Sequence, residues 1–241
     1  MKLKFKFSQL QLAALSAGLL GFLLRSVLYT TALDEQGLLV AGHWTQPFLL
    51  ALSVLILVLA GFGCLLLPLP AKTPGRIQSL MAGAGCFAGA AGFLIVGLGN
   101  RLQISGALDR ASLLLSFAAA AGLVFVGIHR CIGRKPHFAA HLAVCLALAI
   151  RMISQYRHWS SAPQLADYSF LILALVTLML TAYHAASIDA GVSGWRLSRF
   201  YGLMAVFFSM VSAYGASDPL IPLCGLWALT NLPFFRHSGS T

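Results

Sequence analysis

Long apolar runs recur from one end of the chain to the other, and they constrain its fold more than any other feature. Each run is roughly 16 to 24 residues long, about the length of a helix that crosses about 30 Å of hydrocarbon. Hydrophobic residues make up 59% of the 241 residues and charged residues only 9%. A soluble protein of this length cannot hide so much apolar surface from water. The sequence therefore predicts an all-α, polytopic transmembrane helical bundle.

The apolar runs predict eight membrane-spanning helices, at about residues 9–31, 47–67, 77–98, 111–129, 137–155, 167–187, 197–214 and 219–235. The connections are too short to fold separately, so residues 1–241 are expected to form a single membrane domain. The first run lacks a clear small-residue cleavage site, so we expect it to be retained as a helix. The last run is the shortest and has Pro222 and Pro233 near its ends. This leaves a seven-span alternative, in which the last run is re-entrant or interfacial.

The charged residues predict the orientation of the helices. With the N-terminus in the cytoplasm, eleven lysines and arginines fall on the inner side and three on the outer side, as the positive-inside rule requires. The acidic residues show the opposite bias, with one inside, Asp189, and five outside: Asp34, Glu35, Asp109, Asp167 and Asp218. We therefore expect a plasma or inner cell membrane protein with both termini in the cytoplasm.

The excess of basic residues indicates which partners to expect. The formal net charge is +10, and most of this charge faces the anionic headgroups of the cytoplasmic leaflet, so the bilayer itself is the expected partner. Nucleic-acid binding needs a solvated basic domain, and the sequence predicts none. None of the five cysteines falls in a predicted outer loop, so no disulfide framework is expected.

Two arginines lie within predicted spans and suggest a repeat. Arg25 and Arg151 each lie near the outer end of a span, each follows an apolar pair, and a tyrosine follows each of them, Tyr29 and Tyr156. The two arginines are separated by 126 residues, close to half of the chain. This spacing suggests two four-span halves, 1–132 and 133–241, related as a parallel 4+4 repeat.

The same arginines are the candidate binding residues. An arginine near the centre of a span costs about 2.5–3.5 kcal/mol, so it usually faces the bundle interior or a carboxylate, although near a helix end it can reach the headgroups instead. An arginine that faces the bundle would attract an anionic group. The predicted outer site comprises the two arginines with the tyrosines and acids near them: Arg25, Arg151, Tyr29, Tyr156, Asp34 and Asp167.

No local motif indicates a catalytic, metal or cofactor site. His137 and His141 are spaced i, i+4, but no nearby carboxylate or HExxH pattern supports metal binding, and no nucleophile–base set is evident. No cofactor is expected, and an enzyme is disfavoured. Small residues recur at four-residue spacing in two predicted spans, which indicates close packing between helices or, as an alternative, a homodimer. These positions are Gly85, Ala88, Gly89 and Gly92 in the third span and Ala118 and Gly122 in the fourth.

Three functional hypotheses follow. The first is a carrier of small solutes or anions, or the membrane-embedded binding component of one, with its polar site in the outer half. The second is a non-transporting sensor or assembly partner, in which the arginines only reach the headgroups. The third is a membrane-embedded enzyme whose site is assembled from separate helices. The depth and facing of Arg25 and Arg151 distinguish the first hypothesis from the second.

Overall fold

The computed structural model describes residues 7–32, 43–66, 75–99, 106–159, 168–192, 194–214 and 218–234, without the side chains of Phe7, His158 and Trp159. These residues form helices and no strands, which confirms the all-α prediction. The elements are α1 (Phe7–Thr31), α2 (Thr45–Leu66), α3 (Arg76–Gly99), α4 (Ala107–Ile132), α5 (Phe138–Trp159), α6 (Ser169–Asp189), α7 (Trp195–Ser212), α8 (Leu220–Asn231) and the short 3-10 helix η3 (Leu232–Phe234).

Six of these helices, α1 to α6, are long and apolar enough to cross a membrane. Their apolar segments contain 20 to 26 residues, and a rise of 1.5 Å per residue makes them about 30–39 Å long. This length matches about 30 Å of hydrocarbon. The prediction of a multi-pass membrane protein is therefore confirmed.

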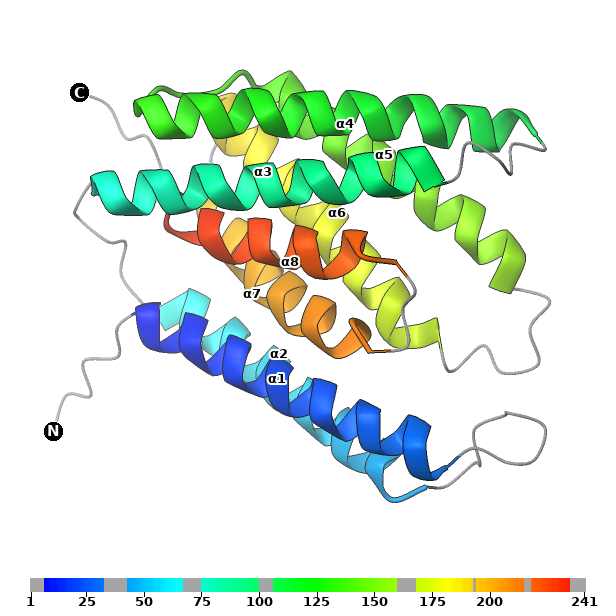
Figure 1. Cartoon of the computed structure of the whole chain (residues 1–241). Helices are drawn as coiled ribbons and strands as arrows, with labels where there is room; N and C mark the ends of the chain where they lie inside the picture. Colours follow the sequence, from blue (N-terminus) through cyan, green and yellow to red (C-terminus); the bar gives the residue numbers. More distant parts are fainter. Residues whose placement is uncertain are drawn as a thin grey trace, which may run out of the picture.

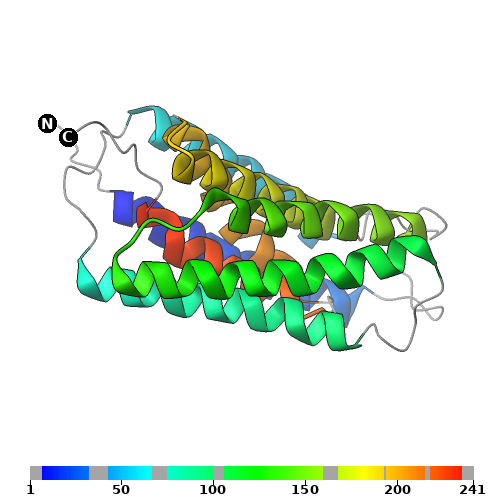
Figure 2. The same ribbon diagram turned by 90° about the horizontal axis from the view of Figure 1, so that it is seen from above.

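The helices form one bundle in which neighbours in sequence run in opposite directions (Figure 1). On one side, α3 packs against α4, and the packing continues from α4 to α5 and from α5 to α6. The α1–α2 pair lies on the opposite side of the bundle (Figure 1) and packs against α7. Seen from above, α3 and α4 run side by side (Figure 2). Whether residues 1–132 and 133–241 are duplicated halves stays a prediction.

The short helix α8 lies inside the bundle. It packs against α3 and α7 and also contacts α6, and Leu220, Ile221, Cys224 and Trp227 are completely buried. Its 12 residues are shorter than a full span, but this burial disagrees with placing it at the membrane interface. Pro219 is the N-cap residue of α8, so Asp218 lies one residue before the cap. Asp218 Oδ1 nevertheless accepts a hydrogen bond from the Leu220 N–H at 3.1 Å.

The outward faces of the helices are apolar. On α2, Leu50, Val54, Leu57 and Phe62 are each at least half exposed. An exposed apolar surface of this extent is unfavourable in water but ordinary in contact with lipid. The exposed side chains of α2 therefore face the acyl chains, and its buried residues, such as Leu49 and Ile56, face the bundle.

The small residues of α3 and α4 allow close approach within the bundle. A Cβ added at Gly89 would lie 3.1 Å from Leu123 Cδ1 of α4 and 3.3 Å from Trp227 Cβ of α8. On α4, a Cβ at Gly122 would lie 2.8 Å from the carbonyl oxygen of Ala140 in α5. These glycines are therefore used in internal packing, which is the first of the two interpretations of their spacing. A homodimer stays a prediction.

Candidate functional site

Arg25 lies in the last third of α1, six residues before the helix ends at Thr31. The residue is 5% exposed, so its side chain is buried within the protein. Its guanidinium donates to the Tyr29 hydroxyl at 3.3 Å, and its central carbon lies 5.5 Å from the Tyr29 ring centroid and 5.6 Å from that of Phe170. These contacts hold the cation against two aromatic faces, an arrangement that stabilises a desolvated guanidinium.

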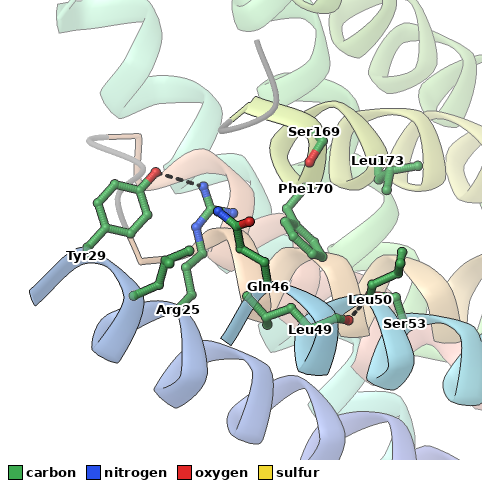
Figure 3. A pocket seen from close by; sticks show the side chains of 10 residues that line it. Arg25, Tyr29, Gln46, Leu49, Leu50, Ser53, Ser169, Phe170 and Leu173 are labelled. Atoms are coloured by element: carbon green, nitrogen blue, oxygen red, sulfur yellow. Dashed lines mark hydrogen bonds between the residues drawn. The ribbon is translucent and has the colours of Figure 1, made fainter. Parts of the chain in front are cut away.

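A pocket of about 390 Å³ opens beside Arg25 between α1, α2 and α6 (Figure 3). This volume lies within the range of about 300–1,000 Å³ that small-molecule sites occupy. The lining combines one cation with hydroxyl, amide and apolar side chains: Arg25, Leu28 and Tyr29 from α1, Gln46, Leu49, Leu50 and Ser53 from α2, and Ser169, Phe170 and Leu173 from α6.

The N-terminus of α6 adds to the positive potential of this pocket. Ser169, which lines the pocket, is the first residue of α6. This helix has no acidic residue in its first turn and no side-chain cap hydrogen bond. The unpaired N–H groups of a helix start carry about half a positive charge, which favours an anion nearby. Arg25 and this helix end therefore favour an anionic group in the pocket.

Arg151 is also buried, but the structure places it elsewhere. It lies on α5, is 8% exposed, and forms an ion pair through Nη2 with Asp218 Oδ2, just before α8. Asp218 was one of the five outer carboxylates that the sequence offers as partners. Because Asp218 also accepts the Leu220 N–H, Arg151 ties α5 to the start of α8. Arg151 is not among the residues that line the pocket.

The remaining predicted site residues fall into two groups. Tyr156 lies on α5 with about half of its surface exposed, and it is not among the pocket residues. Asp34 and Asp167 lie outside the described residues. Of the six predicted residues, the structure thus brings Arg25 and Tyr29 together in the pocket.

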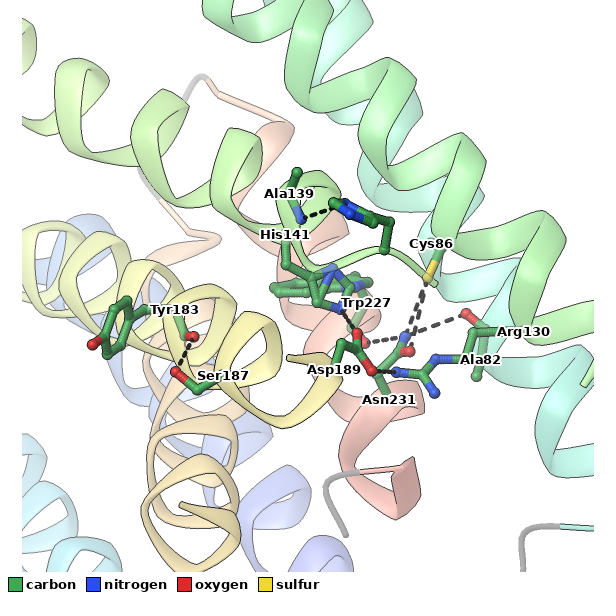
Figure 4. A network of polar contacts seen from close by, with 11 residues as sticks. Ala82, Cys86, Arg130, Ala139, His141, Tyr183, Ser187, Asp189, Trp227 and Asn231 are labelled. Carbon is green, nitrogen blue, oxygen red and sulfur yellow. Dashed lines mark hydrogen bonds and ion pairs between the residues drawn. The ribbon is translucent and has the colours of Figure 1, made fainter. Parts of the chain in front are cut away.

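A second polar cluster lies at the other end of the bundle, where α4 and α6 end and α5 begins (Figure 4). Asp189 Oδ1 is 3.4 Å from Arg130 Nη2, and Asp189 Oδ2 is 3.3 Å from His141 Nε2. The three side chains are 9% exposed or less. Arg130 also lies over the Phe234 ring, 4.7 Å from its centroid. The Asp189 carboxylate therefore joins α6 to α4 and α5, and Arg130 joins α4 to η3.

Asn231 extends the polar contacts from α8 to α3. Its side-chain amide donates to the carbonyl oxygens of Ala82 at 3.3 Å and Trp227 at 3.0 Å, and the Cys86 thiol lies 3.8 Å from Asn231 Oδ1. In the described residues, Arg130 Nε and His141 Nδ1 have no hydrogen-bond partner. A buried polar group costs free energy unless it is paired, so the contacts that this cluster does make are important for stability.

This cluster corrects two expectations from the sequence. We expected Asp189 to lie beyond the end of its span on the inner side, but its side chain is only 4% exposed. We also expected His137 and His141 to share a helix face, whereas His137 precedes α5 and is exposed while His141 is buried against Asp189. One indication of this contact was present in the sequence, because Asp189 and Arg130 were both expected on the inner side. Their pairing could not be predicted, because it depends on how α4, α5 and α6 pack together.

The described residues include no group of three or more His, Cys, Asp or Glu side chains that could hold a metal ion. The five cysteines are free thiols. Comparison with models of protein families, with curated proteins and with solved structures finds no match to this chain. The argument about function therefore rests on the geometry of the pocket.

Proposed function

We propose that this membrane protein binds an anionic solute in the Arg25 pocket, as a carrier of that solute or as the membrane-embedded binding component of one. One observation carries the proposal: a buried arginine lines an open pocket that is otherwise mostly apolar. An intramembrane arginine that faces a cavity commonly marks a ligand or ion pathway. The N-terminus of α6 at the same pocket supports binding of negative charge.

The cation is expected to supply much of the affinity. A hydrogen bond to a charged group contributes about 1.5–3 kcal/mol net, and about 1.4 kcal/mol corresponds to a tenfold change in affinity. Removing the charge should therefore weaken binding of an anion by about tenfold to a hundredfold. An uncharged ligand of the same shape should lose little.

Radiolabelled octanoate is a suitable probe, with octanamide as its uncharged match. We expect Arg25→Gln in phosphatidylcholine nanodiscs to bind octanoate at least about tenfold more weakly, while its binding of octanamide changes little. Equilibrium dialysis against empty nanodiscs measures binding above partition into lipid. Arg110→Gln is the control, because Arg110 is an exposed arginine at the start of α4 and does not line the pocket. An equal loss in both variants, or equal wild-type binding of octanoate and octanamide, contradicts the proposal.

We further propose that the pocket faces the outside of the cell membrane, with both termini in the cytoplasm. The support is the charge bias of the sequence, with eleven basic residues on the inner side and three on the outer side. In a cysteine-free background, Gln36→Cys should react with an impermeant maleimide in intact cells. Thr73→Cys should react only after the cells are permeabilised. Reaction of Thr73→Cys but not Gln36→Cys in intact cells would mean that the orientation is reversed.

A further inference from the structure

The mouth of the Arg25 pocket opens toward lipid. Leu50 of α2 and Leu173 of α6 both line the pocket, yet they are 66% and 42% exposed. Both belong to membrane-spanning helices, so their exposed surfaces face acyl chains. A ligand can therefore reach the pocket from the side, between α2 and α6.

The packing of the bundle explains this opening. On one side α2 packs against α1 and α7, while on the other α6 packs against α5, α7 and α8. Side chains from α2 and α6 approach each other as opposite walls of the pocket, with Leu50 on one wall and Leu173 on the other (Figure 3). The pocket is thus a slot between two helices that are each held by other neighbours.

The slot extends from the start of α2 about two turns along that helix. Gln46 lies one residue from the outer end of α2 and Ser53 eight residues from it, or roughly 12 Å along the helix. Half of the hydrocarbon layer is about 15 Å thick. The pocket therefore runs along most of one leaflet, which matches the direction of a lipid chain.

The polarity of the lining changes with depth. Tyr29, Gln46 and Ser169 lie close to the helix ends, and the Arg25 guanidinium reaches toward the end of α1 to the Tyr29 hydroxyl. Leu50 and Leu173 lie about one turn deeper than Gln46 and Ser169. The deepest polar residue, Ser53, donates its hydroxyl to the Leu49 carbonyl oxygen at 2.8 Å. Its hydroxyl hydrogen is thus used within α2, and the deep wall of the pocket is largely apolar.

From this geometry we propose that the ligand is an anionic amphiphile, with a carboxylate or phosphate head at Arg25 and one alkyl chain along Leu50 and Leu173. It enters sideways from the outer leaflet. This inference rests on the proposed function and names its substrate class. The same chemistry occurs in a lipid of the bilayer and in a free fatty-acid-like solute, and the experiment below distinguishes these sources.

Chain length gives a test that needs no variant. Burying one methylene strengthens binding about fourfold. Octanoate has four more methylenes than butanoate, so wild-type protein should bind octanoate at least about tenfold more tightly even with a partly open mouth. Binding above the empty-nanodisc background is again measured by equilibrium dialysis. Equal affinity for the two carboxylates would overturn the inference.

A variant that fills the deep end gives a second test. Ser53→Phe should weaken octanoate binding about tenfold and leave butanoate binding nearly unchanged, because only the longer chain reaches this depth. Leu57→Phe is the matched control, since Leu57 is an exposed residue of α2 one turn further along that does not line the pocket. Loss of octanoate binding in Leu57→Phe but not in Ser53→Phe would contradict the inference.

Nanodiscs that contain phosphatidylglycerol identify the source of the ligand. If a bilayer lipid occupies the slot, added phosphatidylglycerol weakens octanoate binding to the wild type. If phosphatidylglycerol does not compete, the ligand is a free amphiphile.

The two proposals can fail separately. If Arg25→Gln leaves octanoate binding unchanged, both proposals fail. If Arg25→Gln weakens octanoate binding, but binding depends neither on chain length nor on Ser53→Phe, only the proposal of an amphiphilic ligand fails.

Discussion

Replacing Asp189 with alanine is expected to lower the free energy of unfolding by about 3–5 kcal/mol, because it leaves the buried Arg130 guanidinium without the carboxylate that it contacts. Arg130 Nη2 lies 3.4 Å from Asp189 Oδ1, and their side chains are 9% and 4% exposed. His141 also loses its contact with Asp189 Oδ2 at 3.3 Å. Unfolding in mixed micelles of dodecyl sulfate and a mild detergent, followed by circular dichroism, measures the change.

A double variant separates the ion pair from the rest of the site. Arg130→Met with Asp189→Leu replaces both charges by apolar side chains, and such a replacement of a buried pair is often close to neutral. The double variant should therefore unfold with a higher free energy than Asp189→Ala. The single variants Arg130→Met and Asp189→Leu complete the cycle. If their changes in the free energy of unfolding add up to the change in the double variant, the two residues are not coupled and the account of this cluster is wrong.

The ion pair between Arg151 and Asp218 should show a similar effect. Asp218→Ala is expected to lower the free energy of unfolding by about 3 kcal/mol, because the Arg151 guanidinium then stays in the bundle without this partner. The side chains of Arg151 and Asp218 are 9% and 11% exposed. The same micelle assay measures the change.

Asparagine at position 218 gives the matched comparison. Its side-chain oxygen can still accept the Leu220 N–H, an interaction of the kind that contributes about 1 kcal/mol at a helix start. Asp218→Asn should therefore be less destabilising than Asp218→Ala by about this amount. If Asp218→Ala is no more destabilising than Arg110→Gln at an exposed position, the pair does not hold α5 to α8.

The long apolar runs predicted most of the fold, because a bilayer limits what a chain can form. Only helices satisfy every backbone polar group within one spanning segment, so a run of about 20 apolar residues predicts a helix almost directly. The predicted ranges correspond in order to α1 through α8. The central position of α8 could not be predicted from its short apolar run, because it depends on the close approach that Gly89 and Gly92 of α3 allow.

The candidate site was predicted only in part. A charge within an apolar run identified Arg25 and Arg151, because such a residue is costly in lipid. No local pattern indicated that Ser53, Ser169 and Phe170 would meet Arg25, since this requires knowing that α1 and α2 lie beside the start of α6. The different surroundings of Arg25 and Arg151 likewise follow from tertiary packing, although the two sequence contexts are alike.

The most direct test of the Arg25 pocket is labelling with a photoreactive fatty acid in nanodiscs, followed by mass spectrometry of the labelled peptides. We predict label on α2 and α6 near Leu50 and Leu173 that excess octanoate displaces and that Arg25→Gln abolishes but Arg110→Gln does not. Label spread evenly over the lipid-facing helices, unchanged by octanoate and by Arg25→Gln, would contradict the account.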